Sequence, residues 1–158
     1  MTYRKHPRSK TLNKKYPPSE PCNCAVCSAY CARPGWRSVT EAAAAIQAGY
    51  ATRMMLELAP NHSFGVLSPA FRGCEGGFAL QDFATKGCNF LSAGRCELHG
   101  TSFQPLECRF CHHERIGLGP RCHADLEKDW MTPAGQDLVN HWIQWMTGIL
   151  TGKSGSLV

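Results

Sequence analysis

The stretch Pro21-Cys-Asn-Cys-Ala-Val-Cys-Ser-Ala-Tyr-Cys31 places four cysteines within ten residues of a 158-residue chain. Cys24, Cys27 and Cys31 follow one another at intervals of three and four residues, and Cys22 lies just before them. In a helical turn, residues at these intervals share one face. We therefore expect their sulfurs to converge on one metal centre, in preference to lying apart as small hydrophobic side chains.

A second group of cysteines and histidines surrounds the stretch Glu107-Cys-Arg-Phe-Cys-His-His113. Cys108-x-x-Cys111 is a knuckle of the kind that presents two thiolates to zinc or to an iron–sulfur cluster. Together with His112, Cys108 and Cys111 form the C-x-x-C-H attachment motif of a c-type haem. Haem attachment needs an exported chain, so we expect no haem and at most one ligand from the two adjacent histidines. The predicted metal ligands are Cys22, Cys24, Cys27, Cys31, Cys88, Cys96, Cys108, Cys111 and Cys122.

The compartment is predicted from the N-terminal residues and from the hydropathy of the whole chain. The N-terminal residues carry charge but lack the apolar run of a secretory signal, and the chain starts at Met1, so no removed leader is expected. No segment reaches the roughly 18 apolar residues of a membrane span. We expect a cytoplasmic protein, in which thiols stay reduced and bind metal instead of forming disulfides.

The net charge of +5 comes from one segment of the chain. Residues 1–20 contain six basic residues and one acidic residue, whereas residues 21–158 contain eleven of each. A basic arm can bind phosphate groups, but the rest of the chain has no basic stripe, so a protein partner is favoured over nucleic acid. We expect a flexible basic arm at residues 1–20, a metal-binding domain at residues 21–150 and a flexible tail at residues 151–158.

Two helices are predicted from start signals in the sequence. Ser38-Val-Thr-Glu41 forms a capping box that opens an Ala-rich helix over residues 41–50, ending near Gly49. Thr132-Pro133 is a good N-cap and first-turn pair, and it opens a second helix over residues 133–149.

Regular structure is predicted to be sparse between these helices. Residues 88–91 and 95–98 have the composition of two short strands joined as a hairpin. Residues 53–59 are predicted as either a helix or a strand. Residues 60–79 are predicted as a loop that contains one short strand near residues 64–67, and residues 100–122 are predicted as a second loop.

These elements predict a small irregular α+β domain, stapled by metal, with a short β-hairpin, an Ala-rich helix and a long C-terminal helix. Its loops lose more conformational entropy on folding than their few apolar contacts can offset. Metal–thiolate bonds can supply the difference. We expect Trp130, Trp142 and Trp145 to close over the cysteine region, because little else in the sequence supplies a core for them.

The run GCNFLSAGRCELHGTSFQPLECRFC, residues 87–111, carries a resemblance to a known family. It resembles the YkgJ-like cysteine-cluster family, described as a zinc- or iron-chelating domain, and the resemblance extends over about residues 22–111. The matching pieces are Cys88-Asn-Phe-Leu, Gly94-Arg-Cys96, Gln104-Pro105 and Cys108-Arg109, with Gln104 in place of an Arg. The N-terminal match is looser, because Cys22, Cys24, Cys27 and Cys31 replace a motif that ends in paired cysteines. The resemblance implies metal chelation, since flagellin lysine N-methylases share this domain and hold an iron–sulfur cluster through it.

The predicted function is therefore metal binding by a binding or redox module. The clustered cysteines are expected to hold an iron–sulfur cluster, with 4Fe–4S favoured because thiolates outnumber those that one zinc requires, or zinc. The alternative is a cluster-dependent group-transfer enzyme of the methyltransferase type, although the chain has no Gly-rich cofactor loop, P-loop or Ser/His/Asp order. Cys74 leaves metal storage or redox sensing as a third class. No catalytic residue is predicted.

Overall fold

The computed structural model describes residues 12–20, residue 22 and residues 24–150 of the chain. It is a small α+β domain with a long C-terminal helix, as predicted. Its α-helices are α2 (Ala25–Cys31), α3 (Val39–Ala45), α4 (Gly119–Trp130) and α5 (Pro133–Leu150). Its strands are β1 (Met54–Leu58), β2 (Gly65–Pro69), β3 (Leu91–Ser92) and β4 (Arg95–Cys96), which pair as two antiparallel hairpins, β1 with β2 and β3 with β4.

Helix α3 begins at the predicted capping box. The Ser38 Oγ accepts a hydrogen bond from the Glu41 backbone N–H at 3.2 Å, and the Glu41 carboxylate accepts one from the Ser38 N–H at 3.1 Å. A π-helical turn, η1 (Ile46–Tyr50), follows the helix. Gly49 lies in this turn with a φ of +101°, a conformation that glycine adopts without steric cost. The helix therefore starts and ends where its sequence signals predict.

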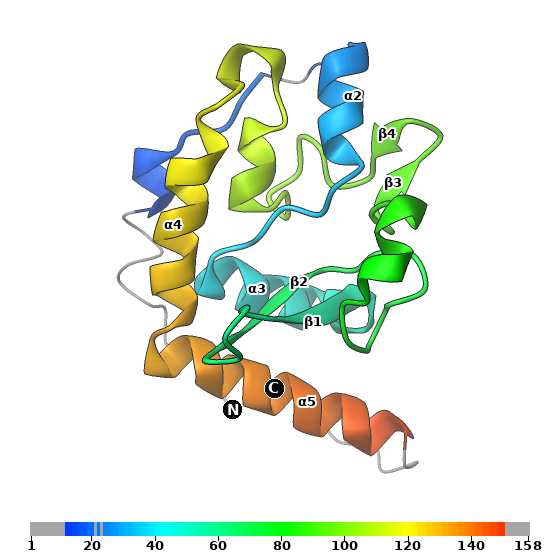
Figure 1. Cartoon of the computed structure of the whole chain (residues 1–158), viewed down its shortest axis with the longest axis vertical. Helices are drawn as coiled ribbons and strands as arrows, with labels where there is room; N and C mark the ends of the chain where they lie inside the picture. The colour runs from blue at the N-terminus through cyan, green and yellow to red at the C-terminus, as the bar shows by residue number, and fades with distance from the viewer. Residues whose placement is uncertain (1–11, 21, 23, 151–158) are drawn as a thin grey trace.

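The main hydrophobic core lies between α3, the β1–β2 hairpin, α4 and α5 (Figure 1). Two buried indole N–H groups connect its parts. Trp130 Nε1 donates to the backbone oxygen of Arg37, and Trp142 Nε1 donates to that of Ala51, both at 2.8 Å. Each indole therefore buries its apolar ring without leaving its donor unpaired.

The tryptophans do not close over the cysteine region. Trp142 and Trp145 pack in the same core as Trp130, and the described members of that core include no cysteine. Figure 1 places α5 and the cysteine-bearing α2 at opposite ends of the molecule. The physical reason is that β1 and β2 supply buried apolar partners, among them Met54 and Leu67. The sequence left the β1 segment undecided between helix and strand and predicted one short strand near residues 64–67.

Helix α4 corrects the loop predicted over residues 100–122. Gly119-Pro120 is a loop signal in the sequence, but here it forms the first turn of α4, where the missing N–H of proline costs nothing. Near the other end of α4, Asp129 Oδ2 accepts from the Val39 N–H at 2.8 Å. A carboxylate at the N-terminus of α3 stabilises the positive end of the helix dipole. Two short 3-10 helices precede α4, η4 (Leu106–Phe110) and η5 (His113–Arg115).

Part of the segment predicted as a basic arm packs on the domain. A helical turn at residues 12–15 buries Leu12 and Tyr16 in an apolar cluster with residues of η4 and α4. Asp125 Oδ2 on α4 accepts from the Tyr16 hydroxyl and, at 2.8 Å, from Lys15 Nζ. The rest of the predicted arm and the predicted tail, residues 1–11 and 151–158, lie outside the described residues.

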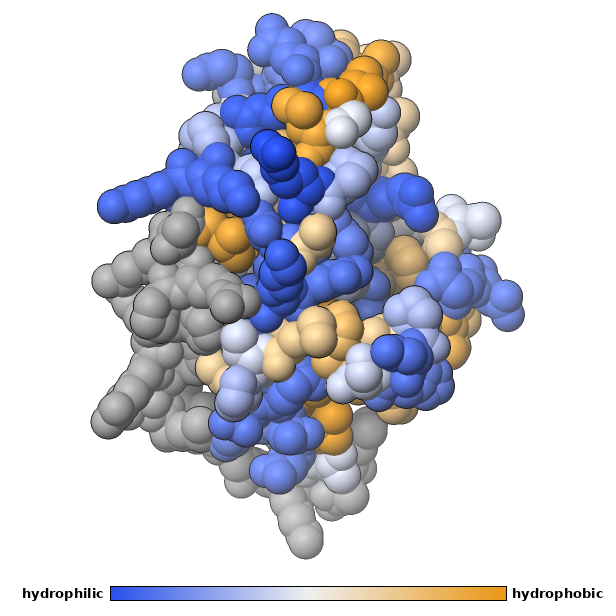
Figure 2. Space-filling view, turned by 60° about the vertical axis from the view of Figure 1, so that its left-hand side comes forward, coloured by the Kyte–Doolittle hydropathy of each residue, from blue (hydrophilic) through white to orange (hydrophobic). Residues whose placement is uncertain are grey.

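The described part of the chain contains no helix with the length and hydropathy needed to cross a bilayer. Figure 2 shows one face of the molecule, on which hydrophilic side chains predominate and hydrophobic ones form small separate patches. Scattered apolar side chains of this kind are normal on protein surfaces, so this face indicates no docking area.

Replacing Ser38 with alanine should lower the free energy of unfolding by about 1 kcal/mol, because the side-chain half of the capping box is lost. Urea denaturation of the metal-loaded protein measures the change. Ser102→Ala, on an exposed turn, is the matched control and should leave the midpoint almost unchanged. Equal stabilities for the two variants would contradict the role of the cap.

Candidate metal centre

The first group of ligands is brought together by α2 and η5. Cys24 is the N-cap of α2, and its Sγ accepts from the Cys27 backbone N–H at 3.5 Å. Opposite this turn, the His113 N–H donates to Cys27 Sγ at 3.2 Å. The ligand atoms of Cys22, Cys24, Cys27 and His113 all lie within 4.8 Å of one another. This group could hold one metal ion.

The spacing of this group matches a single tetrahedral ion. The sulfurs of Cys24 and Cys27 are 3.4 Å apart. Nδ1 of His113 lies 3.6 Å from the Cys22 sulfur, and 3.7 and 3.4 Å from those of Cys24 and Cys27. With Zn–S bonds of about 2.3 Å, tetrahedral geometry separates two sulfurs by about 3.8 Å. Three thiolates and one imidazole form a common structural zinc site.

Only His113 of the two adjacent histidines belongs to this group. His112 is buried, and its Nδ1 accepts from the Glu114 N–H at 3.1 Å. The two imidazole rings stack with their centroids 4.4 Å apart. The stacked ring restricts rotation of the His113 imidazole, so His112 supports the ligand without contributing a metal bond.

The thiols of this group differ in acidity. The hydrogen bond from the Cys27 backbone N–H, together with that from its side chain, lowers the pKa of Cys24 to about 6. Burial raises the pKa of Cys27 to about 11. A metal ion binds the thiolate form, so metal binding must release the proton that Cys27 holds at neutral pH.

The structure separates Cys31 from Cys24 and Cys27. Cys31 is the last residue of α2, which packs against β4, while His113 takes the fourth place in the first group. A second thiol group forms on the β4 side, around a small cavity of about 20 Å³. That volume holds about one water-sized particle. The thiols that line it are Cys31, Cys88, Cys96 and Cys108.

The chain passes close to this second group at Gly35. A Cβ atom at this position would lie 2.6 Å from the sulfur of Cys108 and 2.9 Å from its backbone nitrogen. Any larger residue would push Cys108 away from the cavity. The absence of a side chain at Gly35 therefore keeps the thiol in place.

Cys111 lies beside the second group as a hydrogen-bonding neighbour. A hydrogen bond with Cys111 lowers the pKa of Cys31 to about 7, whereas hydrogen bonds with Cys108 and Cys31 raise the pKa of Cys111 itself. Its Sγ donates to the Tyr30 backbone oxygen at 3.6 Å. Burial raises the pKa of Cys88 to about 12. Hydrogen bonds therefore link the Cys111 thiol to both Cys31 and Cys108 of the second group.

A buried guanidinium, that of Arg37, adjoins the second group. Arg37 is 0% exposed, and its Nη2 donates to the Phe103 backbone oxygen at 3.2 Å. Nε and Nη1 have no hydrogen-bond partner among the described residues. Burial lowers the pKa of Arg37, and Cys108 is the strongest of the nearby charges that oppose this shift. A buried cation requires compensating anions, and Cys108, Glu41 and Cys88 are acidic groups near it.

Cys122 and Cys74 belong to neither thiol group. Cys122 is fully buried in an apolar cluster with Leu106 and Leu126, and burial raises its pKa to about 12. Cys74 is buried in another apolar cluster, with Met55. Both thiols therefore act as small apolar core residues. Cys122 was predicted as a ligand from its place in the second group of cysteines, and the structure places it in helix α4.

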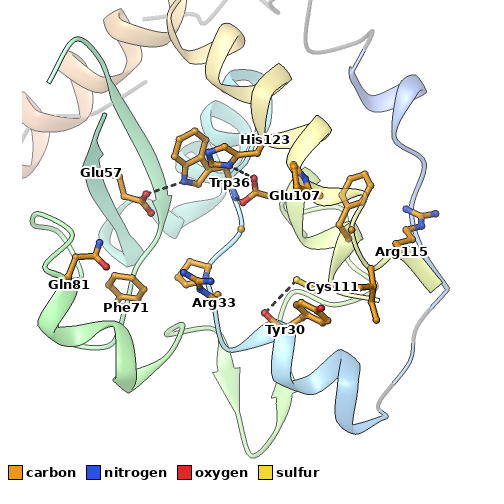
Figure 3. Close-up of a pocket in the computed structure, with 17 residues that line it drawn as sticks. Tyr30, Arg33, Trp36, Glu57, Phe71, Gln81, Glu107, Cys111, Arg115 and His123 are labelled. Carbon is orange, nitrogen blue, oxygen red and sulfur yellow. Dashed lines mark hydrogen bonds and ion pairs between the residues drawn. The ribbon is translucent and has the colours of Figure 1, made fainter. Parts of the chain in front are cut away.

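A larger cavity, of about 620 Å³, opens beside the second group (Figure 3). On its wall, His123 Nδ1 lies 2.7 Å from Glu107 Oε2, and the His123 ring packs on Trp36 with the centroids 4.2 Å apart. Trp36 Nε1 donates to Glu57 Oε2 at 3.2 Å. This arrangement of Trp36, Glu57, Glu107 and His123 was not predictable from the sequence, because the four residues lie in separate segments and share no local motif.

Comparisons of the chain with protein-family models, with curated proteins and with solved structures found no match. The geometry of the two thiol groups therefore carries the functional argument.

The ion pair with Glu107 holds the pKa of His123 above its ordinary value. Folding then favours the protonated form of His123. Its contribution to the stability of the folded protein is complete below the pKa that His123 has in the unfolded chain, and it is lost as pH rises through the raised pKa of the folded state. Between about pH 6 and about pH 9, the wild type should therefore lose more stability than His123→Gln. Urea unfolding at both pH values measures this difference, with His141→Gln on α5 as the control. Equal pH dependence in wild type and His123→Gln would exclude the ion pair.

Proposed function

We propose that this protein is a cytoplasmic binding module whose thiol half is held together by two zinc ions. The first ion is held by Cys22, Cys24, Cys27 and His113. The second is held by Cys31, Cys88, Cys96 and Cys108. The observation that carries the proposal is the convergence of three thiols and one imidazole within 4.8 Å.

A single ion at the first centre is supported by its short distances. The Cys24–Cys27 S–S separation of 3.4 Å and the three S–N separations of 3.4 to 3.7 Å lie close to those around one tetrahedral zinc, and all four ligand atoms lie within 4.8 Å of one another. An iron–sulfur cluster places its thiolates on different irons and so spreads them further apart. The ligand set also favours zinc, because an imidazole beside three thiolates is common in structural zinc sites.

A second ion is supported by the small thiol-lined cavity and by Arg37. Four thiols line this cavity, which is the ligand number of one tetrahedral ion, although among the described residues only the ligand atoms of the first group all lie within 4.8 Å of one another. Four thiolates on a divalent cation leave two negative charges, and the buried Arg37 guanidinium balances one of them. The resemblance of residues 87–111 to a chelating family supports metal at the same thiols. The sequence-based preference for a 4Fe–4S cluster remains the competing assignment for this centre.

The role of the metals in this proposal is structural. Helix α2 has seven residues, too few to be stable alone in water. The ligands lie on α2, the β3–β4 hairpin and the η4–η5 segment, so the two ions tie together elements that are far apart in sequence. Structural zinc contributes on the order of 10 kcal/mol to folding. Cys24 and His113 are exposed, which places the first centre at the surface where a protein partner can contact it.

Metal analysis of the purified protein and of single Cys→Ser variants tests this function. The wild type should contain two zinc ions per chain, and Cys27→Ser and Cys108→Ser should each contain one, because serine is a poor zinc ligand. Cys74→Ser is the matched control and should keep both ions, because Cys74 lies in a separate apolar cluster. Thermal melts under reducing conditions should show a lower midpoint when a chelator removes the metal.

Three outcomes would overturn parts of the proposal. Iron and inorganic sulfide in a brown protein would show that one centre holds an iron–sulfur cluster instead of zinc. That centre would be the one whose Cys→Ser variant loses the colour. Loss of an ion from Cys111→Ser would make Cys111 a ligand. An unchanged melt of the metal-free protein would mean that the thiols are core residues only.

A further inference from the structure

The 620 Å³ cavity beside the second centre contains a carboxylate that lacks a cation of its own. Glu57, on β1, is partly buried on its wall. Its Oε1 accepts from Ser68 Oγ at 2.8 Å, and its Oε2 accepts from Trp36 Nε1 at 3.2 Å. Among the described residues, no lysine, arginine or histidine forms an ion pair with it. Burial accordingly raises the pKa of Glu57.

The other charges around Glu57 do not supply this cation. Glu107, the second carboxylate of the cavity wall, is paired with His123. Arg33 also lines the cavity, but it is an exposed residue and forms no ion pair with Glu57. Arg115 directs its guanidinium to the backbone oxygens of residues 17 and 18. Glu57 is therefore the carboxylate on this wall that forms no ion pair among the described residues, since His123 pairs directly with Glu107 and Glu127 and acts on Glu57 only through its charge.

The free positions on Glu57 fit a donor with two parallel N–H groups. Each carboxylate oxygen has two lone pairs, and each Glu57 oxygen already accepts one hydrogen bond from a neutral donor. One acceptor position per oxygen remains. A guanidinium matches this arrangement with its rigid fork, whereas an ammonium acts as a point charge.

Aromatic rings complete the wall around Glu57. Trp36 and Phe71 line the cavity, and Figure 3 shows Phe71 and Gln81 on the same side of it as Glu57. A flat cation packs favourably on the face of an aromatic ring. The volume of the cavity lies within the range of small-molecule sites, which are mainly apolar with a few placed polar groups.

We propose that this cavity binds an alkylguanidinium group, paired side-on with Glu57 and packed on Trp36 and Phe71. The source of the group is either a free guanidine or an arginine side chain of a peptide. This site is additional to the zinc centres, and it depends on the cavity and not on the identity of the metal.

Nuclear magnetic resonance of the zinc-loaded full chain tests the proposal through the indole N–H of Trp36, which donates to Glu57. The signal is identified by its loss in Trp36→Phe. Butylguanidinium should shift it saturably with a millimolar dissociation constant, the range expected for so small a ligand. Butylammonium should bind at least about fivefold more weakly, because it lacks the fork. Butanol should not shift the signal.

Variants assign the site. Glu57→Gln should weaken butylguanidinium binding at least about tenfold, because the charged acceptor is lost. Glu20→Gln, on an exposed residue, is the matched charge control and should bind as the wild type does. Arg33→Gln should bind equally or more tightly, since it removes a like charge. N-acetylarginine amide distinguishes the sources: tighter binding than butylguanidinium favours a peptide arginine, and weaker binding favours a free guanidine.

The selectivity of the wild type alone can refute the proposal, even if Glu57→Gln does not fold. Equal binding of butanol would show a purely apolar cavity, and equal binding of butylammonium would exclude the fork. No saturable shift with butylguanidinium, or undiminished binding by a folded Glu57→Gln, would each overturn the site.

Discussion

The burial of one guanidinium, that of Arg37, constrains both halves of the molecule. Its backbone oxygen accepts the indole N–H of Trp130 from the main core, and its side chain lies beside the second thiol group. Removing an unbalanced cation from water costs several kcal/mol. The position is therefore stable only if anions gather next to it, and Cys108, Glu41 and Cys88 are acidic groups that lie near it. A metal ion that converts thiols to thiolates satisfies Arg37 and completes the packing around it.

The two halves obtain their stability from different sources. The half around α3, the β1–β2 hairpin and α5 buries large apolar side chains, and its indole and backbone donors are paired. The thiol half contains only single turns and two-residue strands, α2, β3, β4, η4 and η5. Elements so short gain little from their own hydrogen bonds. Cross-links between them, which metal ions supply, are the remaining physical means of fixing their positions.

Local signals allowed the sequence to predict part of this structure. The capping box at Ser38, the helix start at Thr132-Pro133 and the short hairpin near Cys96 are encoded within a few residues, and all three occur. The convergence of Cys22, Cys24 and Cys27 was also predictable from their spacing. Helix α4, the burial of Cys122 and the place of His113 in the first group were not, because each depends on contacts between segments about 20 to 90 residues apart. The surroundings of Glu57 likewise depend on contacts between segments that lie far apart in the sequence.

Helix α2 supplies ligands to both proposed centres. Cys27 and Cys31 stand one turn apart on it, and the segment opposite supplies Cys108 to one centre and His113 to the other. An ion at either centre fixes these two segments, so the second ion binds without the entropic cost of ordering them. Reciprocity requires each centre to raise the affinity of the other by the same factor. In the wild type, half-filled chains are then fewer than independent binding would give, and a variant that has lost one centre holds its remaining ion more weakly.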